Sequence, residues 1–270
     1  MSVARMASAK GSIPVLMYHS ISEGSGPTRI APQVFQRQME ILEESGYQVV
    51  SLPELGEWIR ESRDLPVRST VLTFDDGFLD FATTAFPELL KRRWPVTVFL
   101  PVGHVGGTDH WDASRRGSPQ RLMDWATVGD LAAAGVDFGA HGVTHRDLTQ
   151  LAGDQLADEV LRPKAMIEER LARPVASFAA PFGRSSAIVQ DLVRRHYRQA
   201  VGTELALARI GTEPYAIPRI EMWYFRDPRR WAAFLRGDAR TFLLARRLLR
   251  GLRRMPIVNP RRVDSVGSTP

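Results

Sequence analysis

The stretch that most constrains this chain is Thr70-Val-Leu-Thr-Phe-Asp75-Asp76-Gly77, an apolar run that ends on two adjacent carboxylates and a glycine. Its β-branched and aromatic residues predict a buried strand, and the glycine permits the positive φ of a tight turn. Asp75 and Asp76 are therefore expected where a strand meets a loop, which is where parallel α/β folds build their sites. The alternative is a capping pair for a helix that begins near Phe81. Two adjacent carboxylates repel each other, so a cationic group is expected close by.

The rest of the chain alternates strand-like and helix-like segments, which predicts an α/β protein. This alternation of seven or eight strands with helices favours a barrel over an open sheet. Strands are expected at 13–19, 47–51, 70–74, 95–100, 136–140, 175–180, 198–201 and 215–221, and helices at 31–45, 52–61, 81–92, 122–134, 151–171 and 187–196.

Composition limits the kind of site that the chain can build. The 270 residues are 44% hydrophobic, which is enough for a core of its own. Cysteine is absent, so a metal would have to be held by His, Asp or Glu, and no disulfide can form. The net charge of +6 belongs to the C-terminal tail: residues 226–270 hold twelve Arg and three Asp, which leaves residues 1–225 at −3. We therefore expect no nucleic-acid groove in the main body.

Two histidines, His141 and His145, follow the strand-like segment 136–140 and are expected on the same rim as Asp75 and Asp76. Two imidazoles and a carboxylate form a facial set that suits a divalent metal. His19 also ends a strand-like run. Trp111 lies in the long loop 101–120, where its indole could stack on a sugar ring or could pin the loop to the body.

These motifs resemble those of a known family. Thr73-Phe-Asp75-Asp76-Gly77, His141-x-x-x-His145 and Phe178-Ala-Ala-Pro181-Phe182-Gly183, in this order, are similar to the first three motifs of the polysaccharide deacetylase family, the metal-dependent carbohydrate esterases that include nodulation-type chitooligosaccharide deacetylases. The resemblance covers about residues 13–225. It implies an incomplete (β/α)7 barrel and the removal of an acetyl group from an N-acetylated sugar.

The resemblance also implies roles for individual residues. Asp76, His141 and His145 would hold a divalent metal, with zinc expected first and nickel, cobalt or manganese as alternatives. Asp75 would be the general base, which can take a proton from water beside the metal. The backbone N–H of Phe182 would stabilise the oxyanion. Trp111 and Pro181 are expected to contact the sugar.

Several positions depart from the family pattern. Ala179 stands where the family often has the arginine that pairs with the base, and Arg219 could supply the charge instead or could be a surface residue. No histidine follows His196, so the usual late Leu-x-His motif is absent; His19 is the candidate general acid, with a structural histidine as the alternative. The fourth motif, an Asp near a Trp, is not recognisable. Gly142 occupies a position that is often Ser or Thr, which would remove one ligand-orienting hydrogen bond.

The tail suggests a further element. Residues 228–255 place apolar side chains on one side of a helix and arginines on the other, so the helix could lie on an anionic membrane or could pack on the barrel. The apolar set is Trp231, Phe234, Leu235, Phe242, Leu249 and Leu252. The expected organisation is a disordered segment 1–12, a catalytic barrel 13–225, a basic amphipathic helical extension 226–258 and a disordered tail 259–270.

Location and function follow as hypotheses. The chain lacks an apolar run of about eighteen residues, and residues 1–12 lack the apolar core of a signal peptide, so a cytoplasmic protein is expected, with possible contact with the cytoplasmic face of the membrane. Its partner would be an acetamido sugar, in a polymer, an oligosaccharide or a lipid- or nucleotide-linked precursor. The alternatives are an O-acetyl esterase or non-sugar amidase on the same metal, and a sugar-binding barrel without turnover. The sequence does not predict an oligomeric state.

Overall fold

The protein is described by a computed structural model over residues 11–24, 26, 28–112, 119–238, 242–243 and 245–246. The segments predicted to be disordered lie almost wholly outside these residues. So does most of the predicted helical extension beyond residue 238, including Leu249 and Leu252.

Seven parallel strands form a curved sheet in the order β10-β2-β4-β5-β6-β7-β8, and the short strand β3 pairs with β4 beside this path. This seven-strand parallel half-barrel confirms the predicted incomplete barrel. A separate antiparallel pair, β1 with β9, lies apart from it. The strands are β1 (Ser12–Ile13), β2 (Val15–Tyr18), β3 (Gln48–Val49), β4 (Ser69–Phe74), β5 (Thr97–Leu100), β6 (Asp137–Ala140), β7 (Ser177–Ala179), β8 (Gln199–Val201), β9 (Ala208–Arg209) and β10 (Ile220–Glu221).

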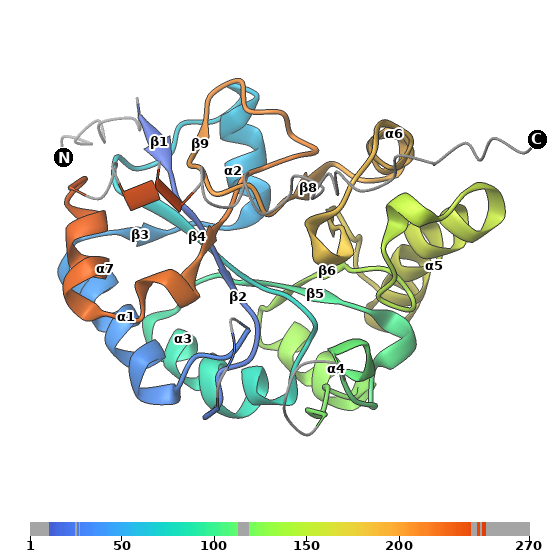
Figure 1. Cartoon of the computed structure of the whole chain (residues 1–270), viewed down its shortest axis with the longest axis horizontal. Coiled ribbons are helices and arrows are strands. Elements are labelled where there is room, and N and C mark those ends of the chain that lie inside the picture. Colours follow the sequence, from blue (N-terminus) through green and yellow to red (C-terminus); the bar gives the residue numbers. More distant parts are fainter. Residues whose placement is uncertain are drawn as a thin grey trace, which may run out of the picture.

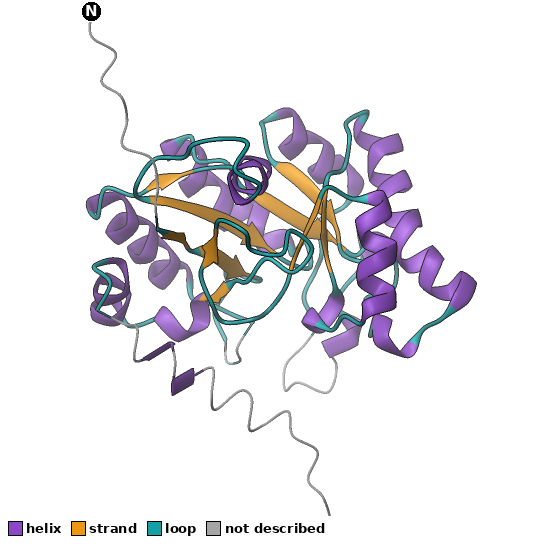
Figure 2. Ribbon diagram, turned by 90° about the horizontal axis from the view of Figure 1, so that it is seen from above, coloured by secondary structure: helices purple, strands orange, loops and turns teal. Residues whose placement is uncertain are grey.

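Helices connect successive strands and cover the outside of the sheet, with α1, α3, α4 and α5 following its curve (Figure 1). Seen from above, helices flank the strands on both sides (Figure 2). The helices are α1 (Pro32–Glu44), α2 (Leu52–Ile59), α3 (Phe86–Arg92), α4 (Trp125–Ala133), α5 (Gly153–Leu171), α6 (Ala187–His196) and α7 (Pro228–Leu235).

Two helices begin differently in the structure than the sequence predicts. The predicted helix 81–92 begins with a π-helical turn, Phe81–Ala85, before α3. The predicted helix 122–134 begins only at Trp125, because Leu122 instead bridges to Phe78 and Asp124 caps the helix through the N–H of Thr127.

Strand β4 shows how the sheet is packed on both faces. Leu72 and Phe74 belong to the core between the sheet and its helices, whereas Val71 belongs to a second core inside the half-barrel. Successive side chains of a strand point to opposite faces, so the alternation sends Thr73 and Asp75 to the same side as Val71. The strand therefore leads directly from the inner core to the rim, where Asp75 follows its last residue.

The chain segment before β10 joins the two edges of the sheet. Ile217 forms a parallel bridge to Val201 at one edge, and Ile220 pairs with Leu16 at the other. Arg219 lies between these two points, and its side chain is 1% exposed. Residues far apart in sequence thus place this arginine inside the half-barrel rather than on the surface.

The first part of the predicted helical extension packs on the barrel. Helix α7 ends at Leu235, and Trp231, Phe234 and Leu235 are all buried in the core that α1 shares. The indole N–H of Trp231 donates to the carbonyl of Gln38 in α1 at 3.0 Å. The apolar face of residues 228–235 is therefore occupied by the protein itself, which is the second of the two alternatives. Among the described residues, no helix is both long and apolar enough to span a bilayer.

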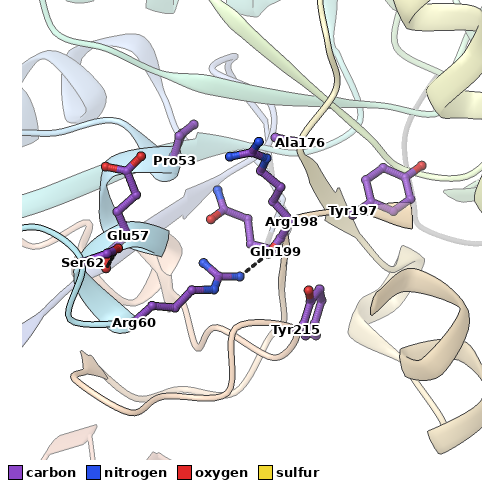
Figure 3. A pocket seen from close by; sticks show the side chains of 9 residues that line it. All are labelled: Pro53, Glu57, Arg60, Ser62, Ala176, Tyr197, Arg198, Gln199 and Tyr215. Carbon is purple, nitrogen blue, oxygen red and sulfur yellow. Dashed lines mark hydrogen bonds between the residues drawn. The ribbon is translucent and has the colours of Figure 1, made fainter. Parts of the chain in front are cut away.

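A cavity lies at the amino-terminal ends of β7 and β8 (Figure 3). Arg60 reaches across it and donates to the backbone carbonyls of Gly56, at 2.7 Å, and Arg198. Because the predicted catalytic residues follow the carboxyl ends of their strands, this cavity is at the opposite end of the fold. Its lining residues are Pro53, Glu57, Arg60, Ser62, Ala176, Tyr197, Arg198, Gln199 and Tyr215.

Candidate metal centre and active site

Three buried side chains converge at the carboxyl ends of two strands. Asp76 follows β4, and His141 and His145 follow β6. The Nε2 atoms of His141 and His145 lie 3.4 Å and 3.1 Å from the Oδ1 atom of Asp76. One ligand atom from each of the three residues falls within 4.8 Å of the others. The structure thus brings together the three predicted metal ligands.

The donor set fits a divalent cation. His141 holds its Nδ1 2.7 Å from the carbonyl oxygen of Ala179, an arrangement in which Nδ1–H donates and Nε2 remains available to an ion. Asp76 Oδ1 and His145 Nδ1 are buried without a hydrogen-bond partner. Unsatisfied buried polar atoms are rare in folded proteins, and a metal would satisfy the carboxylate oxygen. Two imidazoles and one carboxylate match ligands used by catalytic zinc.

The pKa shifts of Asp76 and His145 also suit a metal, whereas that of His141 reflects the neighbouring carboxylates. Burial raises the pKa of Asp76, but the two histidines outweigh it and hold this pKa well below its ordinary value. Burial lowers the pKa of His145, and Asp76 only partly offsets this effect, which favours the neutral imidazole that binds metals. Burial also lowers the pKa of His141, but Asp76 and Asp75 reverse that shift.

The turns that carry the ligands have unusual backbone conformations. Asp76, with φ 73°, and His145, with φ 53°, are non-glycine residues in the left-handed region. Such conformations are costly and are found where function demands a fixed side-chain direction. Gly77 follows with φ 67°, and a Cβ there would come within 2.6 Å of Leu100. Glycine is therefore required directly after the carboxylate pair.

Asp75 forms a buried ion pair with Arg219. Arg219 Nη1 donates to Oδ1 and Nη2 to Oδ2, both at 2.7 Å, and Asp75 is 3% exposed. The same guanidinium donates to Thr73 Oγ1 at 3.2 Å and to the carbonyl of Gly202 at 2.8 Å. Burial raises the pKa of Asp75, but Arg219, with smaller contributions from His141 and His19, lowers it below its ordinary value. The cation expected near the carboxylates is therefore Arg219, whereas Ala179 contributes a backbone carbonyl to His141.

His19 also lies close to Asp75. Its Nε2 is 4.0 Å from Asp75 Oδ2, and its Nδ1 is buried without a hydrogen-bond partner. The loop that follows is fixed by Asp80, which accepts from Ser20 Oγ at 2.6 Å and from the N–H of Ile21 at 2.9 Å. This histidine is therefore held beside the predicted general base, although its role stays a prediction.

Aromatic rings surround His145. Trp111 stacks on its imidazole with ring centroids 4.3 Å apart, and Phe182 meets it edge-on at 4.7 Å. Phe182 has φ 59° within the Pro-Phe-Gly turn, and its ring is 46% exposed. Pro181, in contrast, is buried beneath this turn. The residue exposed at this turn is thus Phe182, and Trp111 contacts a predicted metal ligand; the sugar contacts of Trp111 and Pro181 stay predictions.

The sequence motifs do not reveal the roles of two residues at the site. Thr73 supports Arg219, as described above, and Glu159 of α5 hydrogen-bonds the loop between His141 and His145. Glu159 did leave a signal, because it falls on the stripe of α5 that is otherwise apolar and buried, with Leu156, Val160 and Ile167. An acidic residue at a core position of a helix indicates a specific buried partner.

Comparison with known proteins gives a consistent result. A family model described as polysaccharide deacetylase matches residues 62–201, a stretch that includes Asp75, Asp76, His141, His145 and Phe182. The chain is 24% identical over 211 residues to a putative polysaccharide deacetylase, YxkH, of Bacillus subtilis, and the match covers 78% of this chain and 71% of that protein. It is also 35% identical over 91 residues to the poly-β-1,6-N-acetyl-D-glucosamine N-deacetylase of Escherichia coli, a match that covers 33% of this chain and 13% of that protein.

Solved structures share the architecture. A Streptococcus pyogenes deacetylase, PplD, in complex with acetate, has a TM-score of 0.66 at 25% identity, covering 78% of this chain and 92% of that one. IcaB from Ammonifex degensii has a TM-score of 0.69 at 23% identity, covering 84% of this chain and 98% of that one. At this sequence identity, the likeness to IcaB shows a shared fold alone.

Proposed function

Because this chain belongs to the polysaccharide deacetylase family and is a carbohydrate deacetylase, we propose that it hydrolyses the N-acetyl group of an N-acetylglucosamine residue in an oligosaccharide or polysaccharide. The observation that carries this proposal is the arrangement of a second carboxylate, Asp75, beside the Asp76, His141 and His145 set but outside it. The match to an N-deacetylase that acts on poly-β-1,6-N-acetyl-D-glucosamine supports an amino sugar as the substrate.

A divalent ion held by Asp76, His141 and His145 would supply Lewis acidity and lower the pKa of water. Zinc is the metal that we propose first, and nickel, cobalt and manganese are alternatives. Asp75 accepts the proton of the attacking water on a carboxylate oxygen, and Arg219 keeps that carboxylate ionised and fixed in direction. The N–H of Phe182 donates to the oxyanion that develops on the acetyl carbonyl oxygen.

Protonation of the departing amine falls to His19. Hydrolysis forms a bond between the water oxygen and the acetyl carbon and breaks the bond from that carbon to nitrogen, so the nitrogen must gain a proton. His19 Nε2 lies beside Asp75, and this imidazole is not among the three side chains assigned to the metal. The aryloxide of an aryl acetate leaves without protonation, so His19→Gln should lower kcat on an acetamido sugar on the order of 10²-fold and spare aryl acetate hydrolysis.

The proposal is tested by acetate release from N-acetylglucosamine oligosaccharides and from lipid- and nucleotide-linked conjugates. The metal-reconstituted protein, a chelated sample and Asp75→Asn are compared, with Asp191→Asn of helix α6 as a matched control because that carboxylate is exposed and pairs with the exposed Arg195. Release should require metal and fall on the order of 10²-fold or more in Asp75→Asn alone. Release from O-acetyl esters or non-sugar amides, without release from any acetamido sugar, would refute the assignment of substrate.

A further inference from the structure

In the loop between the two histidines, three hydrogen-bond donors point at one carboxylate. The N–H of Val143 lies 2.7 Å from Glu159 Oε2, and the N–H of Thr144 lies 3.2 Å and 3.1 Å from Oε1 and Oε2. The Thr144 hydroxyl also donates to Oε1. Glu159 therefore binds two of the three backbone amides between His141 and His145, those of Val143 and Thr144, together with one side chain.

The hydrogen bonds from this loop offset the cost of burying the Glu159 carboxylate. It is 4% exposed and lies on the core-facing stripe of α5. Within the described part of the chain it forms no ion pair, so its hydrogen-bond partners are the donors of this loop. Burying a carboxylate costs several kcal/mol unless hydrogen bonds satisfy it. Such a residue is therefore tied to the loop conformation in which these donors converge.

Gly142 makes the close approach possible. It has φ 79°, and a Cβ at this position would come within 2.9 Å of Glu159 Oε2. Because Gly142 has no side chain, the space that a Ser or Thr hydroxyl would fill at this position is occupied by the Glu159 carboxylate. From the segment after β5, the N–H of Val102 donates to the Gly142 carbonyl at 3.1 Å and the N–H of Gly103 donates to the Val143 carbonyl at 2.8 Å. The loop is held by two separate segments of the chain.

We propose that Glu159 is a positioning residue for the metal centre: its carboxylate holds residues 142–144 so that His141 and His145 both present Nε2 toward Asp76. It takes the place of the hydroxyl that Gly142 lacks. The inference rests on the proposed metal-dependent function, although it concerns metal binding rather than turnover. Residues that orient the ligands of a metal site commonly change its affinity 10- to 100-fold when they are replaced.

The test measures zinc and cobalt binding to the metal-free protein by calorimetry, with the cobalt absorption spectrum as a report on ligand geometry. Glu159→Gln keeps the shape but turns an amide NH2 toward N–H donors, and it should weaken metal binding about 10- to 100-fold. Glu168→Gln is the matched control on the same helix, because Glu168 also accepts a backbone N–H, from Val175 at 2.9 Å, but lies away from the site. The control should leave the dissociation constant unchanged.

Two further variants separate positioning from stability. Thr144→Val removes only a hydroxyl donor, at a residue that is exposed as a whole, so it should fold normally and still weaken metal binding severalfold. In a His145→Ala background, Glu159→Gln should change metal affinity much less than it does in the native chain, because the ligand that it orients is gone. Unchanged affinity in Glu159→Gln, or in Thr144→Val if Glu159→Gln does not fold, would overturn the proposal. So would an equal loss with and without His145.

These outcomes are independent of the substrate. If the protein binds metal with the expected dependence on Glu159 but releases no acetate, the substrate assignment fails and the positioning role stands. If acetate is released and metal affinity does not depend on Glu159, the positioning role fails and the proposed activity stands.

Discussion

Replacing Arg219 by Gln tests the central electrostatic feature of the site. The guanidinium makes two charge-assisted hydrogen bonds to Asp75, both at 2.7 Å, and Arg219 is 1% exposed. Each such bond contributes roughly 1.5–3 kcal/mol, and removing one partner of a buried ion pair typically costs about 3–5 kcal/mol because the other charge is left uncompensated. We therefore expect Arg219→Gln to lower the free energy of unfolding by about 3–5 kcal/mol.

The assay is urea unfolding of the metal-free protein, followed by tryptophan fluorescence and circular dichroism and extrapolated to zero urea. Arg198→Gln is the matched control, because Arg198 is exposed and its guanidinium makes no ion pair within the described residues. Its cost should stay within about 0.5 kcal/mol. Equal costs for the two variants would refute the burial argument and restore the view of Arg219 as a surface residue.

The double variant Asp75→Asn with Arg219→Gln sharpens the measurement. Each single change leaves one buried charge without its partner, whereas the double change leaves none. The double variant should therefore be more stable than the sum of the single costs implies, by roughly 1–3 kcal/mol. Strict additivity would show that the two side chains do not interact.

Three further predictions concern other parts of the molecule. Burial, partly offset by a hydrogen bond from Thr97, raises the pKa of Asp137. The unfolded chain then ionises first and stability falls as the pH rises above about 4, so Asp137→Asn should raise Tm at pH 7 but not near pH 3, as measured by calorimetry. Trp231→Ala removes a fully buried indole and its hydrogen bond to Gln38, and should cost about 3–5 kcal/mol in urea unfolding. Trp111→Ala should raise KM for an oligosaccharide on the order of tenfold with less effect on kcat, as measured by steady-state acetate release.

Each has a result that would count against it. A Tm difference for Asp137→Asn that is the same at both pH values would indicate a packing effect instead of a titration. A cost below about 1 kcal/mol for Trp231→Ala would mean that the start of the extension does not dock on the barrel. An unchanged KM with weaker metal binding in Trp111→Ala would mean that the indole supports His145 and does not contact the sugar.

The strand before Asp75 and the positions of His141 and His145 were predictable because their signals are local. A run of apolar residues that ends on a polar side chain fixes the strand and its end, and parallel strands bring their carboxyl ends to one rim. Asp76, His141 and His145 therefore meet at the place that the motifs indicate. The half-barrel was predictable for the same reason, since alternating strands and helices leave few other arrangements.

The partners of these residues could be identified only from the tertiary structure. Arg219 reaches Asp75 because the segment before β10 bridges both edges of the sheet, a contact between residues 144 positions apart. Glu159 reaches the loop at Gly142 because α5 packs beneath it. The amphipathic pattern of residues 228–235 is equally compatible with a membrane and with a protein surface, and the packing of Trp231 against α1 settles it for this segment. Local sequence specifies which side chains are available at the rim, whereas long-range packing specifies which charge each of them meets.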